Sequence, residues 1–168
     1  MTYELFYYRP VPGRTLRDIY QVDISTTDSD EATLEPYRII DKGGVAAALT
    51  GLGFVIERDE DAFNLDPEGH DDRSDKIELV HEGENGTGAV VAIWDCHMSL
   101  HVPLADQHPG RDVEVEGMLR RVSCACHDQG LMGYDPKHDR ELTPANLHVL
   151  AEEITHGEAT GKPWWKLW

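Results

Sequence analysis

Features that would place a chain in a membrane or outside the cell are absent from this sequence. It holds no run of about 18 apolar residues, so no membrane span is expected. Its first residues include Glu4 among tyrosines and a phenylalanine, which is not the pattern of a secretory signal. The three cysteines, Cys96, Cys124 and Cys126, cannot all pair, so we expect reduced thiols. These absences predict a cytoplasmic protein.

Basic residues are also few: 15 Lys and Arg stand against 32 Asp and Glu, for a net charge of −17. Nucleic acids and anionic membranes draw much of their affinity from Lys and Arg, so neither is expected as a partner. Acidic residues concentrate between Glu57 and Glu84, and this segment is expected to form an acidic face. A solvated surface is the simpler interpretation, and attraction of a basic protein is the functional one. The candidate contact residues here are Glu57, Asp59, Asp61, Asp71 and Asp72.

Tryptophan is unevenly placed, because Trp164, Trp165 and Trp168 lie within the last five residues. Each buries roughly 200 Å² when it docks, so this end is expected to pack against something. Three interpretations stay open: docking on its own domain, exchange with a second copy in a homodimer, or binding of another protein. The three tryptophans are therefore candidate partner-binding residues.

The length of 168 residues suits one sizeable core. We predict one α+β domain over residues 1–161, followed by a Trp-rich tail over 162–168. The expected architecture is an antiparallel or mixed sheet with helices on one face. It becomes a ferredoxin-like β-α-β-β-α-β core if one middle strand is an extension or an edge strand.

Alternating and aromatic segments predict the strands, which are bounded by turn residues. The first strand is expected to be central, and residues 14–36 are expected to be a loop or an edge strand. The fourth predicted strand has an alternating pattern that continues as far as Val102. The predicted strands are Thr2–Tyr8, Phe54–Arg58, Lys76–His81, Ala89–Trp94 and Leu131–Tyr134.

Three helices follow from apolar residues at helical spacing. Asp41 is expected to cap the first, whose buried stripe includes Val45 and Leu49. Asp112 is expected to cap the second, with Thr143 capping the third and Pro144 at its first position. The stripe of the second helix comprises Val115, Met118, Leu119, Val122 and Cys126.

No catalytic signature or cofactor motif is present, so no catalytic residue and no cofactor are predicted. The thiol of Cys124 and the ring of His127 lie three residues apart, so they could share a metal ion, and they are the weak metal candidates. They also lie near Arg120 and Arg121, a setting that can activate a cysteine. A metal-dependent or thiol enzyme using this helix and the strand with His97 and His101 is therefore the alternative function.

Two short stretches resemble small uncharacterised bacterial proteins. They are the opening residues 3–8, YELFYY, and Gly133-Tyr134-Asp135-Pro136 ahead of a capped helix and a Trp-containing end. Some proteins of this kind act as immunity partners of secreted toxins, so the resemblance implies that the acidic face binds a basic protein. The favoured hypothesis is a non-enzymatic bacterial binding protein that contacts its partner through the acidic face or the Trp-rich tail.

Overall fold

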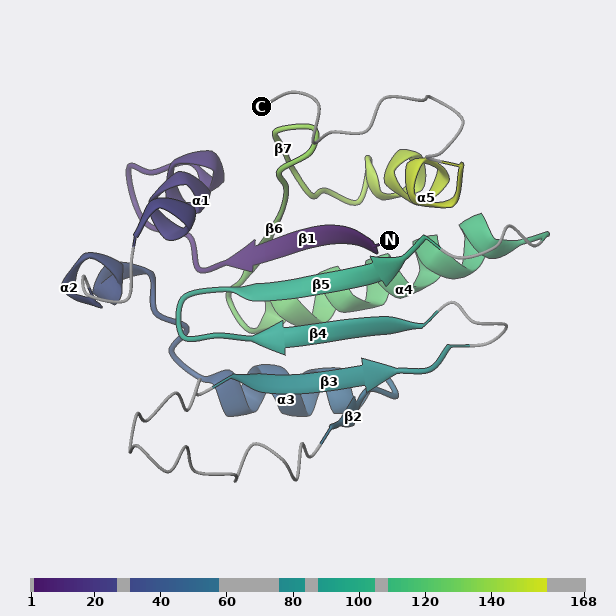
Figure 1. The fold of residues 1–168 in the computed structure, drawn as a ribbon, viewed down its shortest axis with the longest axis horizontal. Helices are drawn as coiled ribbons and strands as arrows, with labels where there is room; N and C mark the ends of the chain where they lie inside the picture. Colours follow the sequence, from purple (N-terminus) through teal and green to yellow (C-terminus); the bar gives the residue numbers. More distant parts are fainter. Residues whose placement is uncertain (1, 27–30, 58–75, 84–87, 105–108, 157–168) are drawn as a thin grey trace, which may run out of the picture.

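The computed structural model describes residues 2–26, 31–57, 76–83, 88–104 and 109–156. Within them, the chain forms a seven-stranded antiparallel sheet with strand order β2-β3-β4-β5-β1-β6-β7 (Figure 1). The strands are β1 (Thr2–Tyr8), β2 (Val55–Ile56), β3 (Ile77–His81), β4 (Ala89–Ile93), β5 (Met98–Pro103), β6 (Met132–Asp135) and β7 (Arg140–Glu141). The helices are α1 (Leu16–Ser25), α2 (Glu31–Leu34), the 3₁₀ turn η2 (Glu35–Tyr37), α3 (Lys42–Thr50), α4 (Arg111–Asp128) and α5 (Leu147–His156). The predicted α+β class is confirmed.

The first strand is central, as predicted, because β1 pairs with β5 on one side and with β6 on the other. Helix α4 connects β5 to β6, which run parallel to each other with β1 between them. In chain order, β1, α3, β4, β5, α4 and β6 follow the pattern of a β-α-β-β-α-β core, in which β1 lies between the two strands that α4 connects. Strands β2 and β3 extend that core at one edge and β7 extends it at the other. The short β7 was not predicted.

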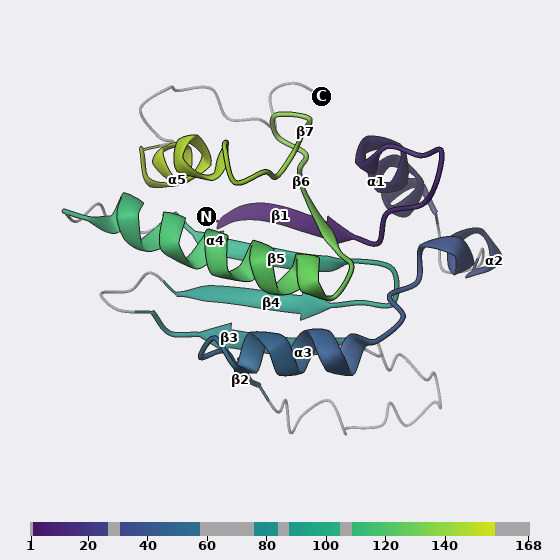
Figure 2. The same ribbon diagram turned by 180° about the vertical axis from the view of Figure 1, so that it is seen from behind.

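The main core lies between the sheet and helices α3, α4 and α5 (Figure 2). Side chains of β1 alternate, so Tyr3, Leu5 and Tyr7 enter this core. The predicted stripe of α4 is buried here: Val115, Leu119, Val122 and Cys126 are at most 1 % exposed, and Met118 is 5 % exposed. A smaller core on the opposite face joins Tyr8 of β1 to α1.

The region 14–36, predicted as a loop or an edge strand, contains helix α1, and this expectation was wrong. Its start carries a capping box: Thr15 Oγ accepts from the amide of Asp18 at 3.1 Å, and the Asp18 carboxylate accepts from the amide of Thr15 at 3.0 Å. Leu16 and Ile19 of the helix are buried, and Tyr20 and Val22 pack partly buried against the same cluster. The capping box and an apolar face therefore define this helix together.

The expected continuation of β4 as far as Val102 was also wrong. A tight turn ends β4, in which the amide of Trp94 donates to the carbonyl of His97 at 2.8 Å. The chain then reverses, and β5 pairs antiparallel with β4. The apolar alternation of the two strands happens to continue across the turn, which conceals it in the sequence.

The predicted caps had mixed outcomes. Asp41 caps α3 by accepting from the amide of Gly44 at 2.8 Å, as expected. The cap residue of α4 is Gly110, in the left-handed region at φ 87°, where Asp112 was expected. Helix α5 begins at Leu147, later than the predicted cap Thr143 and first residue Pro144. There the side chain of Asn146 accepts from the amide of Thr143 at 2.9 Å.

A buried carboxylate, Asp135, ties β1, β6 and β7 together. It is 0 % exposed and accepts from Tyr3 Oη at 3.1 Å and from Arg140 Nε at 3.0 Å. Arg140 also donates to Glu153 of α5 at 2.5 Å. Burial tends to lower the pKa of Arg140, but the bond and charge of Glu153 and the charge of Asp135 outweigh it and raise the pKa. The network therefore joins the sheet to α5 through ionised groups.

Replacing this carboxylate should destabilise the fold. We expect Asp135→Ala to lower the free energy of unfolding by about 3 kcal/mol, because it leaves buried donors without their acceptor. Urea unfolding followed by circular dichroism measures the change. The control is Glu152→Ala on α5, whose side chain is 50 % exposed and should cost less than about 0.5 kcal/mol. Equal losses in the two variants would contradict a structural role for the network.

Candidate functional site

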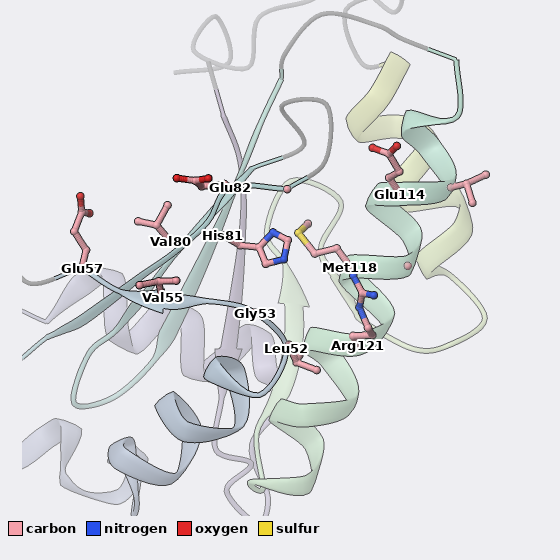
Figure 3. A pocket seen from close by; sticks show the side chains of 13 residues that line it. Leu52, Gly53, Val55, Glu57, Val80, His81, Glu82, Glu114, Met118 and Arg121 are labelled. Carbon is pink, nitrogen blue, oxygen red and sulfur yellow. The ribbon is translucent and has the colours of Figure 1, made fainter.

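A groove of about 860 Å³ lies between the β2–β3 edge of the sheet and helix α4 (Figure 3). One wall comes from the end of α3 and from β2 and β3, and the other comes from the first half of α4. Part of its surface is apolar, contributed by Leu52, Val55, Val80, Val113 and Met118. Val113 is 68 % exposed, so a large apolar side chain meets solvent here. Val55 is 69 % exposed and pairs with Val80, and both of these side chains point away from α4 (Figure 3). Exposed apolar surface of this kind is typical of interaction sites.

The sheet wall is shaped by glycines at the two chain reversals beside it. Gly53, at φ 96°, lets the chain turn from α3 into β2, and Gly83, at φ 66°, follows β3. Between them lies His81, whose ring packs on Phe54 with 5.0 Å between ring centroids. The Nδ1 atom of His81 is shielded from solvent and has no hydrogen-bond partner among the described residues. This nitrogen is therefore covered by the protein's own atoms and is not presented to the groove.

The helix wall contains a glycine that internal packing does not explain. Gly117 lies in the middle of α4, where glycine costs roughly 1 kcal/mol relative to alanine. A Cβ atom built at this position meets no described atom within 4 Å, and its φ is not in the left-handed region. Neither crowding nor backbone strain within the described chain requires glycine here. A bare backbone lining a groove is suited to the close approach of a bound molecule.

The rim of the groove is acidic. Glu57 and Glu82 are exposed and Glu114 is half-buried, while Arg121 is the basic residue lining the groove within the described chain. Of the predicted contact residues, Glu57 is therefore placed at the groove. The others, Asp59, Asp61, Asp71, Asp72, Trp164, Trp165 and Trp168, lie outside the described residues.

Sequence reasoning missed most residues of this site, among them His81, Glu114, Gly117 and Met118. Met118 was predicted only as part of the buried stripe of its helix. The signal that could have found the site is Gly117, since it interrupts an otherwise strong helical pattern without ending the helix. Glu82 lies within the predicted acidic segment but was not singled out.

The thiol and imidazole candidates lie elsewhere. Cys124 and His127 are both exposed on α4, and they belong to no group of three ligands among the described residues. The other two cysteines are buried. Burial raises the pKa of Cys96 to about 11 and that of Cys126 to about 12, so both thiols stay neutral at physiological pH. These two cysteines have a packing role.

One group of side chains in the described residues has the composition of a metal site. Ligand atoms of Asp135, His138 and Glu153 lie within 4.8 Å of one another. However, the guanidinium group of Arg140 donates to both Asp135 and Glu153. A cation already holds these carboxylates together, so the arrangement is that of an ion-pair network.

The fold and the groove together define an α+β protein with an acid-rimmed apolar groove at one edge of its sheet. The described part of the chain has no helix with the length and hydrophobicity needed to cross a membrane. Comparison of the chain with protein-family models, with curated proteins and with solved structures finds no match.

The open space at Gly117 predicts that Gly117→Ala will stabilise the protein. We expect the free energy of unfolding to rise by roughly 0.5 to 1 kcal/mol, because alanine restricts the unfolded chain and favours the helix. Urea unfolding measures this. In the control, Gly130→Ala, the left-handed φ of 77° should make the same substitution destabilising. A loss of stability in Gly117→Ala would show that the position is closely packed.

The different exposure of the cysteines predicts selective labelling. Under native conditions, iodoacetamide should modify Cys124 alone, and all three thiols should react after unfolding in urea. Peptide mass spectrometry identifies the modified residue, with Cys124→Ser as the control. Rapid native modification of Cys96 or Cys126 would contradict their packing role.

Proposed function

We propose that this chain is a non-enzymatic binding protein whose groove receives a segment of a basic protein. The observation that carries the proposal is the combination of exposed apolar side chains with an acidic rim. Val113 offers surface that gains free energy when covered, at about 25 cal/mol per Å² of apolar area. An apolar side chain of the partner would bury this surface, and flanking Lys or Arg side chains would face the rim.

Charge supports a basic partner over an acidic or neutral one. Three carboxylates, from Glu57, Glu82 and Glu114, line the groove with Arg121, on a chain of net charge −17. Opposite charge accelerates association and rejects partners of like charge more than it adds affinity. Glu57 also begins the acidic segment that the sequence singles out, so the rim and that segment are continuous along the chain.

Gly117 supports a macromolecular occupant that approaches closely. The bare backbone of Gly117 lets an apolar side chain of the partner contact the helix. A cytoplasmic location belongs to the same proposal and agrees with the neutral buried thiols. The resemblance to immunity proteins of bacteria points to a basic toxin as the partner.

Site-specific cross-linking tests the location of binding. A photoreactive phenylalanine analogue at Val113 should cross-link the partner in cells of the source organism. The same analogue at Ile40, which is 84 % exposed and lies outside the groove, should not. A cross-link from Ile40 but none from Val113 would place binding elsewhere.

Charge reversal tests the acidic rim once the partner is in hand. We expect Glu57→Lys combined with Glu82→Lys to slow association about tenfold or more at low salt, because the rim would repel a basic protein. Stopped-flow measurements at several salt concentrations provide the rates. The matched control reverses Glu141 and Glu152, two exposed residues of β7 and α5. If the two double variants slow association equally, the net charge of the protein governs binding, and the proposed role of the acidic rim is wrong.

A further inference from the structure

A second pocket, of about 420 Å³, lies on the sheet face opposite α3 and α4. Figures 1 and 2 show these helices on one side of β3, β4 and β5, and no described helix crosses the other side of these strands. The strand register explains the hollow. Glu78 pairs with Ala92, and Ala92 pairs with Ser99, so two small residues stand side by side in the middle of the sheet. Larger side chains around them form the walls.

Three side chains at one end of this pocket make a cation-binding arrangement. The ammonium group of Lys76 lies 5.4 Å from the ring centroid of Trp94 and 3.5 Å from a carboxylate oxygen of Glu78. An aromatic face next to a carboxylate is the combination by which proteins recognise ammonium and guanidinium groups. The ammonium group of Lys76 therefore occupies the position between Trp94 and Glu78 that a bound cation would take.

Further carboxylates make this region favourable for positive charge. Glu4 lines the other end of the pocket. At the sheet edge, the amide of Glu57 donates to the carbonyl of Glu78 at 3.0 Å, which sets two acidic residues opposite each other on neighbouring strands. Like charges in this relation repel, and a cation nearby relieves the repulsion. Lys76 supplies one such charge.

The pocket also contains a serine, a histidine and a glutamate, but their geometry is not that of a nucleophilic triad. His101 Nε2 lies 3.1 Å from Ser99 Oγ and 3.5 Å from Glu4 Oε1, so both contacts use the same ring nitrogen. A triad requires the serine and the acid to bond different nitrogens. Ser99 is also only 3 % exposed. The arrangement supports binding without covalent chemistry.

We propose that this pocket binds the ammonium or guanidinium group of an organic cation, which displaces Lys76 from the face of Trp94. Glu78 provides the countercharge beside Trp94, Glu4 adds negative charge at the far end of the pocket, and Ala92 and Ser99 provide the floor. The site lies on the other sheet face from the groove and does not depend on the protein-binding role proposed for it. Two sources of the group are a free polyamine and a lysine side chain of a peptide.

Titration of the full chain with two probes at physiological salt tests the proposal. The probes are spermidine and the capped pentapeptide Gly-Gly-Lys-Gly-Gly, and the readout is the indole N–H signal of Trp94 in ¹⁵N-resolved NMR spectra. That signal is assigned by its loss in Trp94→Phe. The proposal expects at least one probe to shift it saturably, and the probe with the lower dissociation constant identifies the source. Binding of both probes without any shift of this signal would overturn the proposal.

Removal of the tethered lysine gives the sharper test. Lys76→Ala should tighten binding by about threefold or more, because the probe no longer competes with an internal cation. The matched control is Lys137→Ala, which removes the same charge from a lysine that lies 4.9 Å from the ring of Tyr3. Trp94→Ala lacks this indole signal, so its binding is measured by calorimetry, and it should weaken binding about fivefold or more on the usual strength of such contacts. Equal tightening in both lysine variants would show a general charge effect and overturn the proposal.

Discussion

The alternation of side chains along β1 is the constraint on which the rest of the structure depends. Tyr3, Leu5 and Tyr7 fill the core beneath the helices, while Phe6 and Tyr8 pack against α1 on the other face. Because β1 pairs with both β5 and β6, its register sets which residues of those strands face each core. A shift of one residue would exchange the two faces and expose both sets of aromatic rings. The polar residue Glu4 marks where the second face becomes open to solvent.

The sequence predicts those parts of the fold in which local pattern and tertiary packing agree. Helix α4 carries its full apolar stripe and β1 its aromatic alternation, so both were found with nearly correct bounds. Helix α1 was missed because its few apolar residues were interpreted as a weak alternation, although Leu16, Ile19 and Tyr20 lie on one helical face. The turn between β4 and β5 was missed because its one turn-forming residue, Asp95, stands within a run in which apolar residues alternate on both sides. In both places a short polar signal was outweighed by a misleading alternation.

The groove could be predicted from the sequence only in part, because its walls come from segments roughly 30 to 70 residues apart along the chain. Acidity identified Glu57, but no local pattern indicates that β3 ends near Gly117 and Met118. That juxtaposition depends on the sheet order, which places β2 and β3 at the edge beyond the cover of α4. Helix α3 lies along these two strands (Figure 2), and the groove opens where the chain leaves α3, at Leu52 and Gly53.

The same two strands account for the opposed surfaces of β3. Its side chains alternate, so His81 reaches the groove beside α4 whereas Glu78 faces the pocket with Trp94 on the other side. Pairing with β2 then brings Glu57, which borders the groove at the sheet edge, opposite Glu78, so the two carboxylates share the sheet face away from α4. Two carboxylates at adjacent positions of an edge pair cost stability unless positive charge lies nearby. Lys76 lies 3.5 Å from Glu78 and supplies such a charge, and the basic partner and the organic cation that we propose would each supply another.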